Sequence, residues 1–214
     1  VIIGKSGSGK SVLLKHLLGL LQPDKGFVEI DGESINNLNY SQLQKVRSKI
    51  GMVFQSGALF DSMTVNDNIY IALDRLENLN QKDLQKRIND SLKEVGMQDT
   101  NNLMPSELSG GMKKRVGIAR AISFNPDYLF YDEPTTGLDP IMSDTINKLI
   151  EKFNKKNGIT SLVITHSMKT VFDVADRVMM LHKGEIYFNG SVNEIKNSKD
   201  RVISSFVNGR DSLD

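Results

Sequence analysis

The chain has 214 residues, of which 39% are hydrophobic and 25% are charged, as is ordinary for a globular protein. This length fits one domain with a sizeable core, or one domain carrying a small inserted lobe. A net charge of +1 gives no reason to expect nucleic acid or an anionic membrane surface as partner. The absence of cysteine excludes disulfides, and no apolar run approaches the ~20 residues that span a bilayer.

Strands and helices alternate along the chain. The chain begins inside an apolar strand, "VII", without an initiator methionine, so we expect earlier strands to be missing. Apolar runs predict further strands over 50–55, 128–133 and 159–166 and a hairpin over 178–190. The alternation within 27–35 predicts a strand pair or a strand edge. Helical spacing and capping residues predict helices over 10–21, 41–48, 64–76, 80–97, 109–124, 140–156 and 167–178.

This alternation predicts the α/β class with a mostly parallel sheet. Residues 56–108 lack a core strand, and we assign them to a helical lobe set into one domain that spans 1–214. Thr64 followed by Asp67 has the spacing of a capping box at the start of the lobe's first helix.

The segment "GKSGSGKS" matches the phosphate-binding pattern G-x-x-x-x-G-K-[ST] between a strand and a helix, the context that supports this motif. Glycines let the backbone approach phosphates, and the helix N-terminus adds positive potential. Lys10 would reach the β- and γ-phosphates of ATP, and Ser11 would ligate Mg²⁺. The predicted ATP-binding residues of this loop are Gly4, Lys5, Ser6, Gly7, Ser8, Gly9, Lys10 and Ser11.

Polar side chains follow three apolar strands, at the edge where open α/β sheets bind ligands. "YLFYDE" ends in Asp132, predicted to hold Mg²⁺, and Glu133, predicted to polarise the attacking water. Gln55 ends another apolar strand, where its amide could reach the metal or a metal-bound water. His166 ends the strand after Glu133, and we predict that it contacts the γ-phosphate.

A second glycine-rich helix start lies in "LSGGMKKR", residues 108–115, here called the signature segment. Ser109 suits an N-cap, and Gly110 and Gly111 would leave helix N–H groups open to an anion. A compact monomer would have no use for this second anion site. We interpret the basic run 113–115 as a solvated helix face, because three charges do not make a nucleic-acid patch.

The motifs occur in the order found in ABC-type ATPases, and the chain resembles that family over essentially its whole length. They are the phosphate loop, Gln55, "LSGGM", "YLFYDEP", "GLDP" with Asp139, and His166. The resemblance implies a P-loop ABC ATPase fold and a head-to-tail homodimer. In such a dimer the Ser109–Gly111 segment of one copy closes over ATP held by the other.

The chain departs from the family pattern at three points. Met112 stands where glutamine is usual, and Ser167 stands where an aspartate commonly follows the histidine. The segment that carries the adenine-stacking aromatic residue in the family would lie before residue 1.

Residues 51–73 and "LSGGM" most closely resemble the ATPase subunit of Mla-type, Mce-associated lipid transporters. The resemblance implies phospholipid transport between the inner and outer membranes, an integral-membrane permease, an Mce-domain lipid-binding partner and a place on the cytoplasmic face of the bacterial inner membrane. An ABC transporter ATPase for another cargo, such as amino acids or lipoprotein release, is the first alternative. A soluble, non-transport ABC ATPase is the second.

Overall fold

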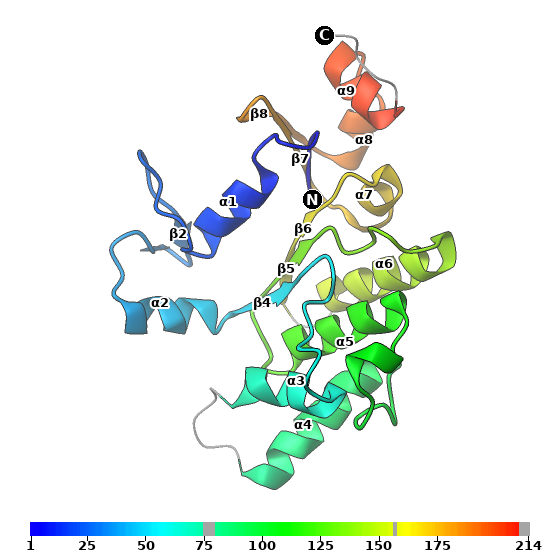
Figure 1. The fold of residues 1–214 in the computed structure, drawn as a ribbon. Coiled ribbons are helices and arrows are strands. Elements are labelled where there is room, and N and C mark those ends of the chain that lie inside the picture. The colour runs from blue at the N-terminus through cyan, green and yellow to red at the C-terminus, as the bar shows by residue number, and fades with distance from the viewer. Residues whose placement is uncertain (75–79, 156–157, 210–214) are drawn as a thin grey trace. The chain divides into compact units, whose positions relative to one another are not determined.

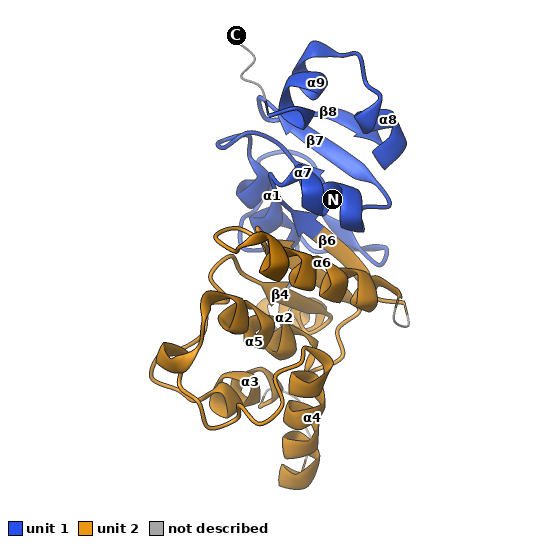
Figure 2. Cartoon of the chain, turned by 90° about the vertical axis from the view of Figure 1, so that its right-hand side faces the viewer, with its two compact units in different colours: residues 1–38, 163–214 blue, residues 39–162 orange. Residues whose placement is uncertain are grey.

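The fold is described from a computed structural model that covers residues 1–74, 80–155 and 158–209 (Figure 1). The chain forms two compact units, residues 1–38 with 163–214 (unit 1) and residues 39–162 (unit 2) (Figure 2). Hydrogen bonds connect the main strands in the order β4-β5-β6-β1-β7-β8. The pairings described for this sheet are parallel except β7 with β8, so the predicted α/β class with a mostly parallel sheet is confirmed.

Unit 1 holds the phosphate-loop motif and both ends of the chain. Its elements are β1 (Ile2–Ile3), α1 (Lys10–Leu17), β2 (Glu29–Ile30), β3 (Glu33–Ser34), α7 (Met168–Val174), β7 (Val178–His182), β8 (Glu185–Gly190), α8 (Val192–Lys196) and α9 (Arg201–Val207). Buried apolar residues of β1, α7, β7, α8 and α9 form its core, among them Ile3, Val171, Met180 and Ile203. The core therefore supports the short strand from which the phosphate loop leaves.

Both hairpins of unit 1 are confirmed. β2 and β3 pair antiparallel across Asp31 and Gly32, and β7 and β8 pair across Lys183 and Gly184, all four with positive φ. Positive φ at both central residues is what a two-residue hairpin turn requires. The helix predicted over 167–178 is too long, because it ends at Val174 and Val178 already belongs to β7.

Unit 2 carries the carboxylates and the signature segment. Its elements are α2 (Tyr40–Arg47), β4 (Ile50–Val53), α3 (Val65–Leu73), α4 (Gln81–Glu94), the 3₁₀ turn η1 (Pro105–Glu107), α5 (Gly110–Ile122), β5 (Tyr128–Asp132) and α6 (Pro140–Lys155). β6 (Thr160–Ile164) begins in this unit and ends in unit 1. The helix α5, which begins within the signature segment, packs against β4, α3 and α4 and is thereby anchored in the unit.

Local chemistry explains where the helices of unit 2 begin. The Thr64 hydroxyl accepts from Asp67 N–H at 3.1 Å, and the Asp67 carboxylate accepts in return from Thr64 N–H, so the predicted capping box is confirmed. The helix α6 has one buried apolar face, formed by Ile146, Leu149, Ile150 and Phe153.

Some predictions reach beyond the described residues. The ends of the helices expected over 64–76 and 140–156 fall partly there. Between 56 and 108 the described residues form α3, α4 and η1, without a strand. Nowhere in 1–74, 80–155 or 158–209 does a helix combine the length and apolar character needed to cross a membrane.

Candidate functional site

The phosphate loop of unit 1 has a backbone that only glycine accommodates well. Gly4, Gly7 and Gly9 have φ values of 154°, 77° and 102°. A Cβ on Gly4 would lie 2.5 Å from the Leu181 carbonyl oxygen, a contact that side chains essentially never make. Gly9 is the N-cap of α1 and supplies no side-chain hydrogen bond. Because glycine has no side chain, no side chain at the N-cap accepts a hydrogen bond from the first N–H groups of α1. These N–H groups can therefore bind an anion.

Lys10 lies over this loop. Its Nζ donates to the carbonyl oxygens of Gly4 at 2.7 Å and Lys5 at 2.9 Å, which holds a cation beside the glycine turn. Within the loop the buried Ser8 hydroxyl finds no hydrogen-bond partner among the described residues. Lys5, Ser6 and Ser11 are exposed. A cation, an unsatisfied hydroxyl and an uncapped helix N-terminus together fit a phosphate group.

His166 lies on the same sheet edge as this loop, within unit 1. The parallel strands β1 and β6 pair Ile2 with Ile164, and Gly4 and His166 each follow two residues later. Neighbouring strands lie about 5 Å apart, so the two residues leave the sheet side by side. The strand stops at Ile164, two residues earlier than predicted, and His166 is exposed.

The carboxylates and Gln55 share a sheet edge in unit 2. The parallel strands β4 and β5 pair Val53 with Tyr131, so Gln55 and Glu133 each lie two residues past this pair. Asp132 is the last residue of β5, which confirms its predicted place at the strand end. Gln55 is exposed and Asp132 and Glu133 are half-buried. The ends of β4 and β5 thus bring together two carboxylates, those of Asp132 and Glu133, and the neutral amide of Gln55.

Glu133 is held in an unusual conformation. Its φ is 49°, in the left-handed region that non-glycine residues rarely adopt, and such strain is common at functional sites. Its Oε2 accepts from the Thr136 hydroxyl at 3.0 Å. The turn from Glu133 to Thr136 therefore fixes the direction of this carboxylate.

The signature segment forms the start of α5 in unit 2. Ser109 is the N-cap, and its hydroxyl accepts from Met112 N–H at 3.3 Å, as predicted. Ser109 and Gly110 are exposed, whereas Gly111 is buried. A Cβ on Gly111 would lie 2.2 Å from the Met142 methyl group at the start of α6. Glycine therefore permits the close approach of the Met142 side chain and leaves the N–H groups of the helix start open.

The interpretation of 113–115 as a solvated face is wrong. The side chain of Lys114 is buried, with 5% of the residue exposed, and its Nζ donates to the Thr136 carbonyl oxygen. Arg115 is half-buried and donates to the Gly96 carbonyl oxygen at 3.1 Å. A signal in the sequence could have indicated this, since Lys114 shares a helical stripe with the buried Gly111, Ile118 and Ala121.

Arg120 is a second residue of α5 that the sequence analysis missed. Its guanidinium is half-buried and donates to the carbonyl oxygens of Gly57 at 3.0 Å and Ala58 at 2.8 Å, just after Gln55. Burial lowers the pKa of Arg120. Gly117 meets the same segment, since a Cβ there would lie 3.1 Å from the Gly57 backbone. The segment after Gln55 is therefore fixed to α5.

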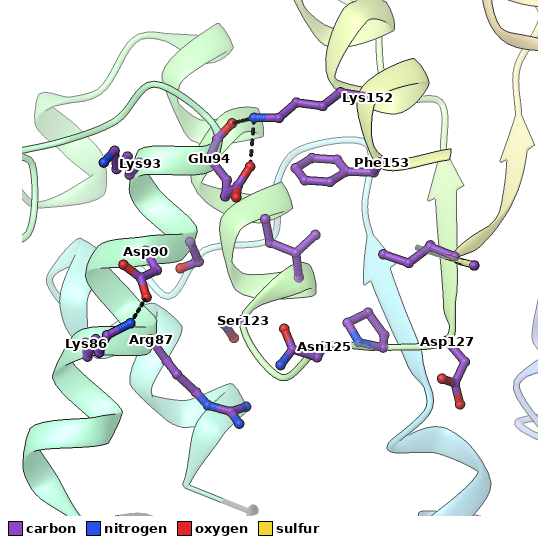
Figure 3. A pocket seen from close by; sticks show the side chains of 15 residues that line it. Lys86, Arg87, Asp90, Lys93, Glu94, Ser123, Asn125, Asp127, Lys152 and Phe153 are labelled. Carbon is purple, nitrogen blue, oxygen red and sulfur yellow. Dashed lines mark hydrogen bonds and ion pairs between the residues drawn. The ribbon is translucent and has the colours of Figure 1, made fainter. Parts of the chain in front are cut away.

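Unit 2 also contains a polar cleft of about 900 Å³ (Figure 3). It is lined by α4, by residues 122–127 before β5 and by the end of α6. Two of its cations are paired, Lys86 with Asp90 and Lys152 with Glu94, each at 2.7 Å. Asp127 precedes β5 and Glu133 follows it, about 20 Å away along an extended strand. The cleft is therefore at the amino end of β5, whereas ligands of such sheets bind at the carboxyl end.

A model of the ABC transporter family matches residues 1–136 of the chain. The methionine import ATP-binding protein MetN of Corynebacterium jeikeium is 42% identical over 207 residues, 96% of this chain and 56% of that protein. MetN of Carboxydothermus hydrogenoformans is 42% identical over 208 residues, 97% of this chain and 61% of that protein.

Among solved structures, the fold is similar to the ATP-binding cassette MJ0796 in a dimeric, post-hydrolysis state bound to ADP and Pi. The TM-score is 0.81 at 33% identity, over 89% of this chain and 84% of that one. The chain spans less than two thirds of the length of the curated relatives reported above. These relatives are named for methionine import, so they give no support to the expected Mla-type subgroup.

Proposed function

This chain belongs to the ABC transporter family, and from that premise we propose that it is the ATP-hydrolysing subunit of a transporter. The observation that carries the proposal is the phosphate loop, in which Lys10 lies over a glycine turn at an uncapped helix N-terminus. The loop would hold the phosphates of ATP through backbone N–H groups and the Lys10 ammonium.

The remaining predicted residues have complementary chemistry. Glu133 would accept a proton from, or polarise, the attacking water, and His166 would donate a hydrogen bond to the γ-phosphate. The Ser11 hydroxyl, the Gln55 amide and the Asp132 carboxylate are hard oxygen donors, which fits Mg²⁺, and this ion would neutralise phosphate charge when bound. We propose that these residues serve one nucleotide, as the family resemblance implies.

The first three residues of α5's glycine-rich start, Ser109, Gly110 and Gly111, would serve a second nucleotide, on another copy of the chain. This exposed helix start would be a second anion site, in addition to the phosphate loop. The similar cassette MJ0796 is described as a dimer with ADP and Pi, which supports this arrangement. We therefore propose a homodimer in which ATP lies between the two copies and hydrolysis separates them.

The Glu133→Gln substitution tests this proposal. It removes the charge of Glu133 but keeps its shape, so the variant should bind ATP, hydrolyse it at least about 100-fold more slowly, and accumulate as an ATP-bound dimer. Phosphate release and light scattering after size exclusion measure the two effects. Glu151→Gln on the exposed face of α6 is the matched control and should behave like the wild type. A monomeric Glu133→Gln variant that hydrolyses ATP normally would contradict the proposal.

For the transporter as a whole, we propose an integral-membrane permease as partner and a peripheral place on the cytoplasmic face of the membrane. The names of the relatives support an amino acid, methionine, as the cargo, together with import as the direction. This agrees with the amino-acid alternative. The cargo is not determined by the ATPase fold itself, because one fold serves many functions.

Phospholipid transport with an Mce-domain partner is the second candidate cargo system. The observations that favour it are Met112 in "LSGGM" and the segment 55–65, "QSGALFDSMTV", in which Phe60 is exposed. Affinity purification of the full-length protein from gently solubilised membranes, followed by mass spectrometry, separates the candidates. A permease with an amino-acid-binding protein supports methionine import, and an Mce-domain protein with phospholipid supports the second. ATPase activity without any membrane partner would indicate a soluble ABC ATPase.

A further inference from the structure

Lys114 is a buried charged residue of unit 2. It lies on the second turn of α5 with 5% of the residue exposed, and its ammonium donates to the Thr136 carbonyl oxygen. Burial lowers the pKa of Lys114, and the nearby Glu133 carboxylate opposes this lowering. Burying an ammonium is unfavourable unless partners compensate it, so this contact constrains where the partners lie.

The partners of Lys114 belong to the turn that carries Glu133. Thr136 N–H donates to the Glu133 carbonyl oxygen at 3.3 Å, and the Thr136 hydroxyl donates to Glu133 Oε2 at 3.0 Å. Thr136 therefore links the Lys114 ammonium, through its carbonyl, to the Glu133 carboxylate, through its hydroxyl. The positive φ of Glu133 needs such support, because that conformation is unfavourable by itself.

The same helix carries the signature segment. α5 begins at Gly110, and Gly111 packs against Met142 at the start of α6. Asp139 lies between Thr136 and α6, and its Oδ1 accepts from Ile141 and Met142 N–H groups at 2.9 Å each. The chain from Glu133 to Met142 is thus fixed to α5 at Lys114 and again at Gly111.

We propose that Lys114 is a positioning residue for ATP hydrolysis, which orients the Glu133 carboxylate through Thr136 and couples that orientation to the helix that begins at the signature segment. The inference rests on the proposed function, because it assigns Glu133 to the hydrolysed nucleotide. Movement of the α5 start, where the second copy's ATP would bind, is then transmitted to Glu133 through the buried contact between Lys114 and Thr136.

The test compares Lys114→Met with Lys113→Met in the full-length protein. Both variants remove one positive charge from adjacent positions of α5. The side chain of Lys113, unlike that of Lys114, makes no hydrogen bond to any residue within 1–74, 80–155 or 158–209. We expect Lys114→Met to lower kcat about 10- to 100-fold with KM for ATP changed less than about twofold, because a small misplacement of a reacting group is costly. Lys113→Met should keep wild-type values of both parameters.

Two further variants separate positioning from damage to the fold. Thr136→Val removes the hydroxyl that contacts Glu133 but keeps the carbonyl that contacts Lys114, and it should also lower kcat without raising KM. In a Glu133→Gln background, Lys114→Met should change the residual rate less than about threefold, since both substitutions remove the same contribution.

Wild-type kcat in Lys114→Met or in Thr136→Val would overturn the inference. So would equal losses in the Lys113 and Lys114 variants, or full additivity with Glu133→Gln. Failure of the proposed function gives a different result, because Glu133→Gln itself would then hydrolyse ATP at the wild-type rate.

Discussion

The phosphate loop and the signature segment are both glycine-rich starts of helices, yet they need glycine for different reasons. In the phosphate loop Gly7 and Gly9 have open space where a Cβ would lie, but their φ values are positive. In the signature segment Gly111 belongs to a helix, and the obstacle to a Cβ is the Met142 methyl group. The first glycines serve backbone shape, and the last serves packing.

Capping distinguishes the two helix starts as well. Gly9 supplies no side-chain hydrogen bond to α1, whereas the Ser109 hydroxyl accepts from Met112 N–H at the start of α5. The phosphate loop can therefore surround an anion with its own backbone and Lys10. In the signature segment the Ser109 side chain already caps the helix, and only Ser109 and Gly110 at the helix start are exposed. Such a surface suits contact with a ligand that another copy of the chain binds.

The largest expected difference concerns activity. Lys10→Ala should lower kcat/KM for ATP about 100- to 1000-fold and weaken ATP binding, because a charged donor to the phosphates is lost. Ser109→Ala should lower hydrolysis about 10- to 100-fold while a single copy still binds ATP with wild-type affinity. Equilibrium binding at protein concentrations below dimerisation, combined with phosphate-release rates, measures both. Weakened ATP binding by monomeric Ser109→Ala would contradict the assignment of this serine to the other copy's nucleotide.

The next difference concerns stability. Gly4→Ala should lower the free energy of unfolding by about 3 kcal/mol, because its Cβ meets the Leu181 backbone carbonyl, which cannot move alone. Gly111→Ala should cost less than about 1 kcal/mol, because the flexible Met142 side chain can move and alanine favours a helix. Urea denaturation measures both values. Adding Met142→Ala should relieve the clash in Gly111→Ala, and equal losses at the two glycines would show that their roles do not differ.

The smallest difference concerns capping. Ser109→Ala should lower the free energy of unfolding by about 1 kcal/mol, the usual contribution of an N-cap serine. The matched control is Ser6→Ala in the phosphate loop, where the exposed hydroxyl caps no helix, and it should leave stability within about 0.5 kcal/mol of the wild type. Thermal unfolding in the absence of nucleotide distinguishes the two, and an equal effect would remove the capping distinction between the segments.

Most of the fold could be predicted because strong local signals coincide. The capping box at Thr64, the N-cap at Ser109 and the hairpin turn at Lys183–Gly184 each depend on a few neighbouring residues. Element ends were less accurate. The helix expected over 10–21 ends at Leu17, and Gly19 then adopts a φ of 62°. Apolar residues such as Leu20 and Leu21 extend the helical pattern although the backbone has already turned.

The site could be predicted in its parts, because each polar residue follows an apolar strand or a glycine-rich turn. Lys114 and Arg120 were missed because their roles depend on contacts with Thr136 and Gly57, which lie far away in the sequence. The sequence does not distinguish a buried lysine from a solvated one, except by its position on an apolar stripe of the helix. The cargo was expected from residues 51–73 and "LSGGM", whereas the curated relatives match over almost the entire chain.

Asn68 gives the loop before α3 its shape from the inside. It is fully buried, and its amide accepts from Phe60 N–H at 2.7 Å and donates to the carbonyl oxygens of Phe60, Met63 and Thr64. The outward side chains of Phe60, Asp61 and Ser62 are exposed and take no part in these bonds. Asn68 therefore determines the backbone conformation of the loop, whereas the side chains of residues 60–62 determine the chemistry of its surface. Such a loop can acquire a new recognition surface during evolution by substitutions at 60–62 while its path through space is preserved.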